Sequence, residues 1–140
     1  MTHRDIILGN VFLELNTNPH DPLPWKVMLA DFGCAISRSD FLEKELDTAD
    51  LALEDPRYVP PEGPVLGEAA DVYQIGLILL CLFLRMDQPD PETTHDFIRY
   101  AMQCEDEEYS RKLAVTIALC LHIDPHERPS ARHLALALQS

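Results

Sequence analysis

Two long apolar runs dominate the second half of the chain. Over residues 68–84, apolar side chains cover nearly every face of a helical projection, which predicts a helix buried on most sides. Residues 109–123 form a second long apolar stretch and predict another helix. A shorter helix is expected over residues 95–103. Ser130 is a natural N-cap for a last helix over residues 131–139.

The first third of the chain has a strand pattern instead. VFLEL at residues 11–15 and KVMLA at residues 26–30 predict two short strands. The segment between them, NTNPHDPLPW, is rich in proline and asparagine, so the strands should form a hairpin with a long connection. Residues 34–64 are irregular and rich in charge and proline, and loops of that length are usually functional or disordered. These elements predict one mainly α domain with a small β-hairpin.

Composition and charge narrow the function classes. The 140 residues are enough for one hydrophobic core. The net charge of -13 argues against a nucleic-acid partner and against an anionic membrane surface, because both would need a basic patch. The N-terminus lacks a signal-peptide pattern, and the most apolar run, residues 75–84, is too short to cross a bilayer. A cytoplasmic or nuclear location is therefore expected.

Cysteine and histidine residues do not predict a metal site. The four cysteines form no C-x-x-C pair, so a reduced compartment is expected, and Cys81 and Cys120 lie in apolar runs as small core residues. His122, His126 and His133 are close in sequence, but Pro125 interrupts the helical spacing of the first two. Surface positions are the favoured interpretation for these histidines.

Three oxygen-bearing side chains carry the candidate chemistry. Asp5 and Asn10 bracket a short loop before the first strand, and Asp31 follows the returning strand. A hairpin brings its two ends together, so two carboxylates and an amide should surround one point. Oxygen ligands of this kind suit Mg²⁺, and phosphoryl transfer requires a metal beside a carboxylate that orients the attacking hydroxyl.

Five motifs in order make the chain resemble the protein kinase family. THRDIILGNVFL is similar to the catalytic loop, ADFG to the magnesium-binding motif, and PRYVPPE to the end of the activation segment. EAADVYQIGLILL resembles the central buried helix, and DPHERPSARHL resembles the last motif of the fold. The resemblance implies the C-terminal lobe of the kinase fold, with catalytic loop, hairpin and DFG in residues 1–33, the activation segment in 34–64 and a helical subdomain in 65–140.

The resemblance implies a role for each residue of the catalytic centre. Asp5 would be the catalytic base or the carboxylate that orients the substrate hydroxyl. Asn10 and Asp31 would hold Mg²⁺, and ATP would be the phosphate donor. Phe12 would form the floor beneath the adenine ring, although its apolar character by itself indicates a core residue.

Further matched residues would support these loops. His3 and Phe32 would stack in the hydrophobic spine of the fold. Asp71 would accept hydrogen bonds from main-chain amides of the catalytic loop. Glu62 and Arg128 would form a buried ion pair between the end of the activation segment and the last helical region.

The resemblance also implies contacts and modification sites in the activation segment. Arg4 would clamp a phosphate or carboxylate of this segment with its planar guanidinium fork. Ser37, Ser39 and Thr48 are candidate phosphorylation sites, for which ordinary loop hydroxyls are the favoured interpretation.

Two positions depart from the serine/threonine kinase pattern. Ile7 stands where the family has a lysine that neutralises the transferring phosphate, and losing such a charge can cost about 100- to 1000-fold in rate. Asp55 aligns with a threonine that bonds this lysine and the catalytic aspartate. A second carboxylate near Asp5 would raise a proton affinity or push the loop away.

The motifs of an N-terminal lobe, which would supply the Gly-rich loop, the strand lysine and the adenine hinge, are not in these 140 residues. The expected partners are that lobe and a protein substrate. Three functions remain open. The chain is part of a protein serine/threonine kinase, a pseudokinase-type binding or scaffold module, or an inactive truncated remnant.

Overall fold

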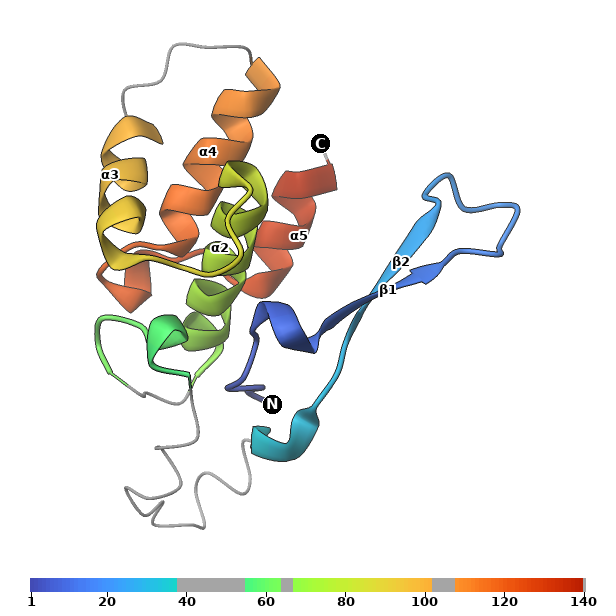
Figure 1. Ribbon diagram of the computed structural model, residues 1–140, viewed down its shortest axis with the longest axis horizontal. Coiled ribbons are helices and arrows are strands. Elements are labelled where there is room, and N and C mark those ends of the chain that lie inside the picture. The colour runs from blue at the N-terminus through green and yellow to red at the C-terminus, as the bar shows by residue number, and fades with distance from the viewer. Residues whose placement is uncertain (38–54, 64–66, 102–107, 140) are drawn as a thin grey trace.

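The protein is mainly helical with one two-stranded antiparallel sheet (Figure 1). The computed structural model describes residues 1–37, 55–63, 67–101 and 108–139. The helices and strands are β1 Val11–Leu15, β2 Trp25–Leu29, α2 Glu68–Leu84, α3 Pro91–Ala101, α4 Glu108–Cys120 and α5 Ala131–Gln139. Short 3₁₀ turns are η1 Leu8–Asn10, η2 Phe32–Cys34, η3 Pro56–Tyr58 and η4 Pro125–Glu127. The predicted combination of helices and a small hairpin is confirmed.

Helix α2 lies at the centre of the helical part and packs mainly against α4 (Figure 1). It spans the predicted residues and buries side chains on most of its faces. Gly76 allows a close approach of α4, because a Cβ at this position would lie 2.7 Å from the Cβ of Cys120. The helix ends at Arg85, whose backbone is left-handed and whose N–H bonds to the carbonyls of Cys81 and Leu82.

The β-hairpin stands away from the helices (Figure 1). Its register pairs Val11 with Leu29, Phe12 with Met28 and Leu15 with Trp25. Because side chains alternate across a strand, Phe12 and Met28 lie on the opposite face from the other two pairs. The expectation that Phe12 belongs to the core is wrong, since 51% of the residue is exposed. A two-stranded sheet has no second layer to cover this face.

Several element bounds differ from the sequence prediction. Helix α3 begins at Pro91 rather than at residue 95, because the Asp90 carboxylate accepts a hydrogen bond from the Thr93 N–H (2.8 Å) and caps the helix. Proline is favoured at the first helical position, so Pro91 starts this helix and does not merely end the preceding region. Strand β2 begins and ends one residue earlier than expected, and α4 ends at Cys120.

The predictions for the α5 cap and for the buried cysteines can be compared directly with the structure. The Ser130 hydroxyl accepts a hydrogen bond from the His133 N–H (3.2 Å), so the predicted cap of α5 is confirmed. Cys81 and Cys120 are buried core residues as predicted, and burial raises the pKa of the Cys120 thiol to about 11. Ser39 and Thr48 lie outside the described residues. Within the described part of the chain, helices long and apolar enough to cross a membrane are absent.

Candidate functional site

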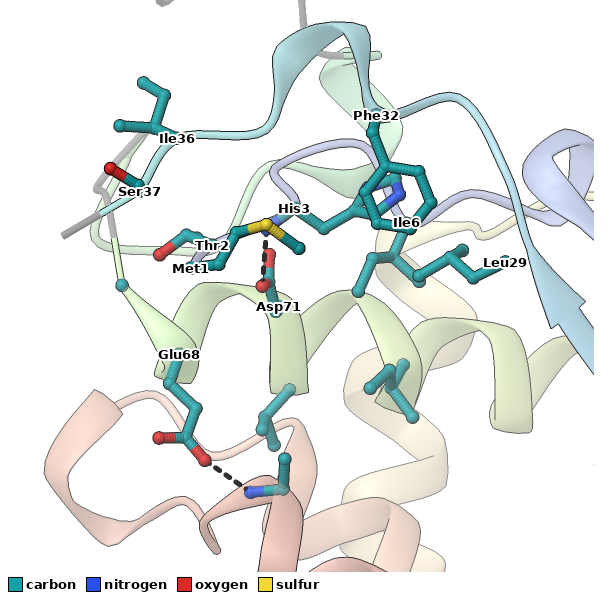
Figure 2. Close-up of a pocket in the computed structure, with 14 residues that line it drawn as sticks. Met1, Thr2, His3, Ile6, Leu29, Phe32, Ile36, Ser37, Glu68 and Asp71 are labelled. Atoms are coloured by element: carbon teal, nitrogen blue, oxygen red, sulfur yellow. Dashed lines mark hydrogen bonds between the residues drawn. The ribbon is translucent and has the colours of Figure 1, made fainter. Parts of the chain in front are cut away.

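The main chain of the N-terminal loop is bonded to two side chains of α2. The Asp71 carboxylate accepts hydrogen bonds from the N–H groups of His3 (2.8 Å) and Arg4 (2.9 Å), and Figure 2 shows this carboxylate beneath the start of the chain. One turn further along, Gln74 accepts from the Ile6 N–H (2.9 Å) and donates to the Arg4 carbonyl (3.1 Å). Burial raises the pKa of the Asp71 carboxyl, and the two main-chain bonds oppose that rise.

Asp5 and Asn10 are joined by their side chains. The Asn10 amide nitrogen donates to the Asp5 carboxylate (2.8 Å) and to the Asp5 carbonyl (2.9 Å). The Asn10 carbonyl in turn accepts from the Ala30 N–H (2.9 Å), which ties the start of β1 to the residue before Asp31. Hairpin pairing therefore brings Asp31 next to the chain segment of the other two residues.

Asp31 occupies a left-handed backbone conformation with a φ of 60°. Its carboxylate accepts a hydrogen bond from the Gly33 N–H (3.2 Å), which caps the short turn η2. Aspartate tolerates this conformation better than most residues because its short side chain bonds locally. The turn also carries Phe32, whose ring meets the His3 ring edge-on at 4.6 Å between centroids.

A cavity of about 670 Å³ lies beside these loops. Figure 2 shows His3, Ile6 and Phe32 around it, with Asp71 of α2 on the opposite wall. His3 is buried, and its Nδ1 accepts a weak hydrogen bond from the Asp5 N–H (3.4 Å). The two rings expected to stack are thus in contact, and their role as a spine stays a prediction.

Arg4 is buried and has a positive φ of 73°. Its guanidinium donates to the Cys34 carbonyl (3.4 Å), just after the DFG sequence. The proposed clamp on a phosphate or carboxylate of the activation segment stays a prediction, because residues 38–54 lie outside the described part.

Asp55 has a local cationic partner. Its carboxylate binds Arg57 through the guanidinium (2.6 Å) and the main-chain N–H (3.0 Å). The side-chain hydrogen bond from Arg57 is the main reason that the pKa of Asp55 is lowered. The expected rise in proton affinity from a second carboxylate is therefore wrong for Asp55, because Arg57 offsets its charge. Arg57 also donates to Gln88, in the connection after α2.

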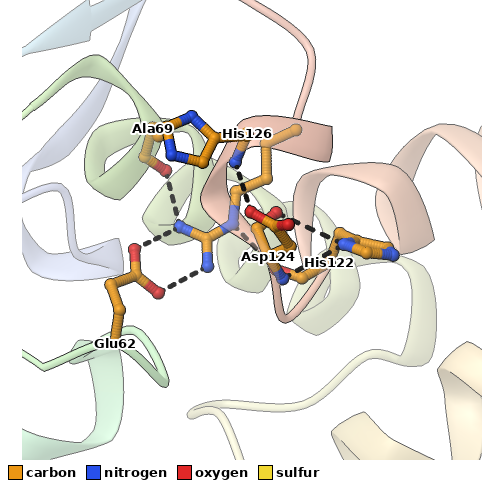
Figure 3. Close-up of polar contacts among 6 residues, drawn as sticks. Glu62, Ala69, His122, Asp124 and His126 are labelled. Carbon is orange, nitrogen blue, oxygen red and sulfur yellow. Dashed lines mark hydrogen bonds and ion pairs between the residues drawn. The ribbon is translucent and has the colours of Figure 1, made fainter.

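Glu62, which precedes α2, forms an ion pair with Arg128, which follows η4. Figure 3 shows the Glu62 carboxylate at this contact. The Arg128 fork donates to both carboxylate oxygens of Glu62, each at 2.6 Å. It also donates to the carbonyls of His122 (2.8 Å) and Ala69 (3.0 Å), and it lies over the Tyr73 ring at 4.8 Å. The Arg128 side chain is fully buried and that of Glu62 is 17% exposed. The ion pair expected between Glu62 and Arg128, which are 66 residues apart, is therefore present.

His122 and His126 form hydrogen bonds within the turn that precedes α5. His122 Nδ1 accepts from the Asp124 N–H (3.1 Å), and the Asp124 carboxylate accepts from the His126 N–H (2.9 Å) (Figure 3). Across the described residues, His, Cys, Asp and Glu form no group of three or more that could hold a metal ion. The candidate magnesium site would use the amide oxygen of Asn10 and the carboxylate of Asp31, so it does not require such a group.

Comparison with known proteins decides the family. The family model described as protein tyrosine and serine/threonine kinase matches residues 1–138. The chain belongs to this kinase family. It is 29% identical over 143 residues to the probable serine/threonine-protein kinase nek2 of Dictyostelium discoideum, and 30% identical over 156 residues to phytosulfokine receptor 1 of Arabidopsis thaliana. Each match covers 94% of this chain, which spans 30% and 14% of the lengths of these relatives.

Two features of this kinase-family chain were not expected from the motifs. Gln74 bonds the main chain of the N-terminal loop, and its sequence signal is a polar residue inside a strongly apolar helix. Ile7 is partly buried, and its side chain packs against the hydrophobic core.

Proposed function

We propose that the chain is the C-terminal lobe of a protein kinase domain that phosphorylates serine or threonine side chains of proteins with ATP. In this proposal residues 1–33 carry the catalytic loop, hairpin and DFG sequence, residues 34–64 the activation segment, and residues 65–140 the helical subdomain. The observation that carries it is the bonded pair of Asp5 and Asn10 at the base of the hairpin, with Asp31 on the neighbouring strand end.

Each residue of this group has a distinct task. Asp5 accepts the hydrogen bond of the substrate hydroxyl and orients its oxygen for attack on phosphorus. The amide oxygen of Asn10 and the carboxylate of Asp31 would hold Mg²⁺. Their donor types fit an ion that prefers oxygen ligands. The Asn10 NH₂ group, bonded to Asp5, keeps the amide oxygen turned away from the Asp5 carboxylate. When bound, the ion supplies positive charge to the phosphate oxygens.

The proposal requires an N-terminal lobe above the hairpin. The cross-strand pair of Phe12 and Met28 presents a large apolar surface, 51% and 44% exposed. An adenine ring lying on Phe12 and a covering lobe would remove this surface from water, which is favourable for apolar area. The N-terminal lobe is therefore the first partner of the chain, and a protein substrate is the second.

A second candidate is a pseudokinase-type binding or scaffold module. Ile7 favours it, because the side chain is neutral and packs against the core at the position of the family lysine. Asp55 offers no replacement, since its carboxylate is negatively charged and is paired with Arg57. Such a module would bind a nucleotide or a protein through the same fold but would not transfer phosphate.

The test is transfer of radiolabelled γ-phosphate by the longest natural polypeptide that contains these residues. Asp5→Asn is the control for transfer, and Asp31→Asn is the control for Mg²⁺-dependent ATP binding. Transfer above the Asp5→Asn level supports the kinase and rules out the pseudokinase. Binding of Mg-ATP without transfer supports the pseudokinase, and loss of both functions leaves the inactive remnant.

We also place the protein in a reducing compartment, the cytoplasm or the nucleus. Cys81 and Cys120 are buried thiols outside any disulfide, which supports this location. The charge of -13 supports the absence of a nucleic-acid or anionic-membrane partner. Imaging of a fluorescent fusion in cells tests the location, and a secretory distribution would contradict it.

A further inference from the structure

Gln74 is a polar residue in the most buried helix of the protein. Only 1% of it is exposed, and its neighbours along α2 are largely apolar. A buried side-chain amide is costly unless its polar atoms are hydrogen-bonded. Both ends of this amide have a partner, and both partners are main-chain groups of the catalytic loop.

The two partners flank Asp5. The Arg4 carbonyl belongs to the peptide unit before the Asp5 Cα, and the Ile6 N–H belongs to the unit after it. One planar amide therefore holds both peptide planes that meet at this Cα, at 3.1 Å and 2.9 Å. The orientation of the two planes determines the direction of the Asp5 side chain, since the chain bends only at φ and ψ between them.

Asp71 cannot replace this contact. Its carboxylate binds the N–H groups of residues 3 and 4, which both precede Asp5. Of the hydrogen bonds from α2 described above, the one from Gln74 to Ile6 alone reaches the peptide unit after Asp5. The Asp5 carboxylate then meets the Asn10 amide at 2.8 Å.

We propose that Gln74 is a positioning residue that fixes the Asp5 main chain, and through it the direction of the Asp5 carboxylate toward Asn10. An effect of Gln74 on catalysis rests on the proposed function. Its effect on the hydrogen bond between Asp5 and Asn10 does not. Residues 74 and 5 are far apart in sequence, so these hydrogen bonds depend on the position of α2 beneath the loop (Figure 2).

The experiment compares Gln74→Met with Gln74→Glu. Methionine keeps the length and fills the space but loses both hydrogen bonds. A glutamic acid accepts from the Ile6 N–H and, when protonated in this buried site, also donates to the Arg4 carbonyl. Thr116→Val is the matched control, because it removes a buried hydrogen bond from a side chain to the main chain within α4 (2.8 Å).

The main readout is the NMR signal of the Asn10 side-chain NH₂ group in the folded protein. In Gln74→Met its exchange with water should become about 5- to 10-fold faster, the effect of losing a hydrogen bond worth roughly 1 kcal/mol. Gln74→Glu should restore most of the difference, and Thr116→Val should leave the signal unchanged. An Asn10 signal that is the same in Gln74→Met and wild type would overturn the proposal.

Two measurements keep the result decisive. If Gln74→Met does not fold, the wild-type Gln74 NH₂ protons are measured directly; exchange as slow as that of core amides supports the contact, and fast exchange refutes it. Where the natural polypeptide transfers phosphate, Gln74→Met should lower kcat with little change in KM for ATP. Absence of transfer in wild type contradicts the proposed function but leaves the NMR result to decide the positioning role.

Discussion

Replacement of Arg128 by alanine should strongly destabilise this domain. The guanidinium makes four hydrogen bonds, two to Glu62 and one each to the carbonyls of His122 and Ala69. Its side chain is fully buried, so water does not already share these contacts. The substitution therefore leaves a carboxylate and two carbonyls without their cationic partner.

The expected loss of stability follows from these four hydrogen bonds. Removing one partner of a buried ion pair typically costs about 3–5 kcal/mol. We place Arg128→Ala near the upper end of that range, because two carbonyl bonds are lost as well. Domains of this size have about 5–15 kcal/mol of stability in total, so a loss near 5 kcal/mol removes about a third of it or more. Glu62→Ala should cost about 3 kcal/mol, because Arg128 keeps its carbonyl partners.

Urea unfolding followed by far-ultraviolet circular dichroism measures both losses. Arg128→Lys keeps the charge but not the planar fork, so its midpoint should lie between those of wild type and Arg128→Ala. The double variant Glu62→Leu with Arg128→Met should be more stable than either single truncation, because no buried charge is left alone. An Arg128→Ala midpoint equal to that of wild type would refute the reasoning.

Two further predictions concern packing and pH. Gly76→Val should destabilise the protein by about 1–3 kcal/mol, because the added carbon atoms overpack the contact of α2 with α4. Thermal unfolding checks this against Gly9→Ala, whose Cβ would lie 3.8 Å from its nearest neighbour, and equal melting temperatures would contradict the close approach. The lowered pKa of Asp55 means that its pair with Arg57 stabilises the fold above the unfolded value of 3.8, and that this contribution is lost as pH falls through the lower folded value. The effect should be small, about 0–1 kcal/mol, since the pair is largely exposed. Arg57→Ala should therefore be slightly less stable than wild type at pH 7, and the difference should become smaller in strong acid, where Asp55 is protonated. A difference that widens in acid would reverse the assigned sign.

The sequence alone was sufficient for the existence and order of the helices and the hairpin, and for the resemblance to the family. The bounds of α2 and α5 follow from apolar runs and an N-cap, because helix formation depends on neighbouring residues. The kinase motifs are short contiguous strings, so they can be read before any contact is known. The start of α3 was also encoded locally, in Asp90 followed by Pro91.

Tertiary structure alone decided how buried polar groups are satisfied. Periodicity describes which side of a helix is apolar, but it does not say which main-chain groups will need a partner after the loop has folded onto it. Gln74 is unexplained until the catalytic loop lies over α2, and Phe12 seemed a core residue until the hairpin was seen without a covering layer. Asp5 and Asn10 could be grouped from their spacing, whereas the bond between them required the loop to close.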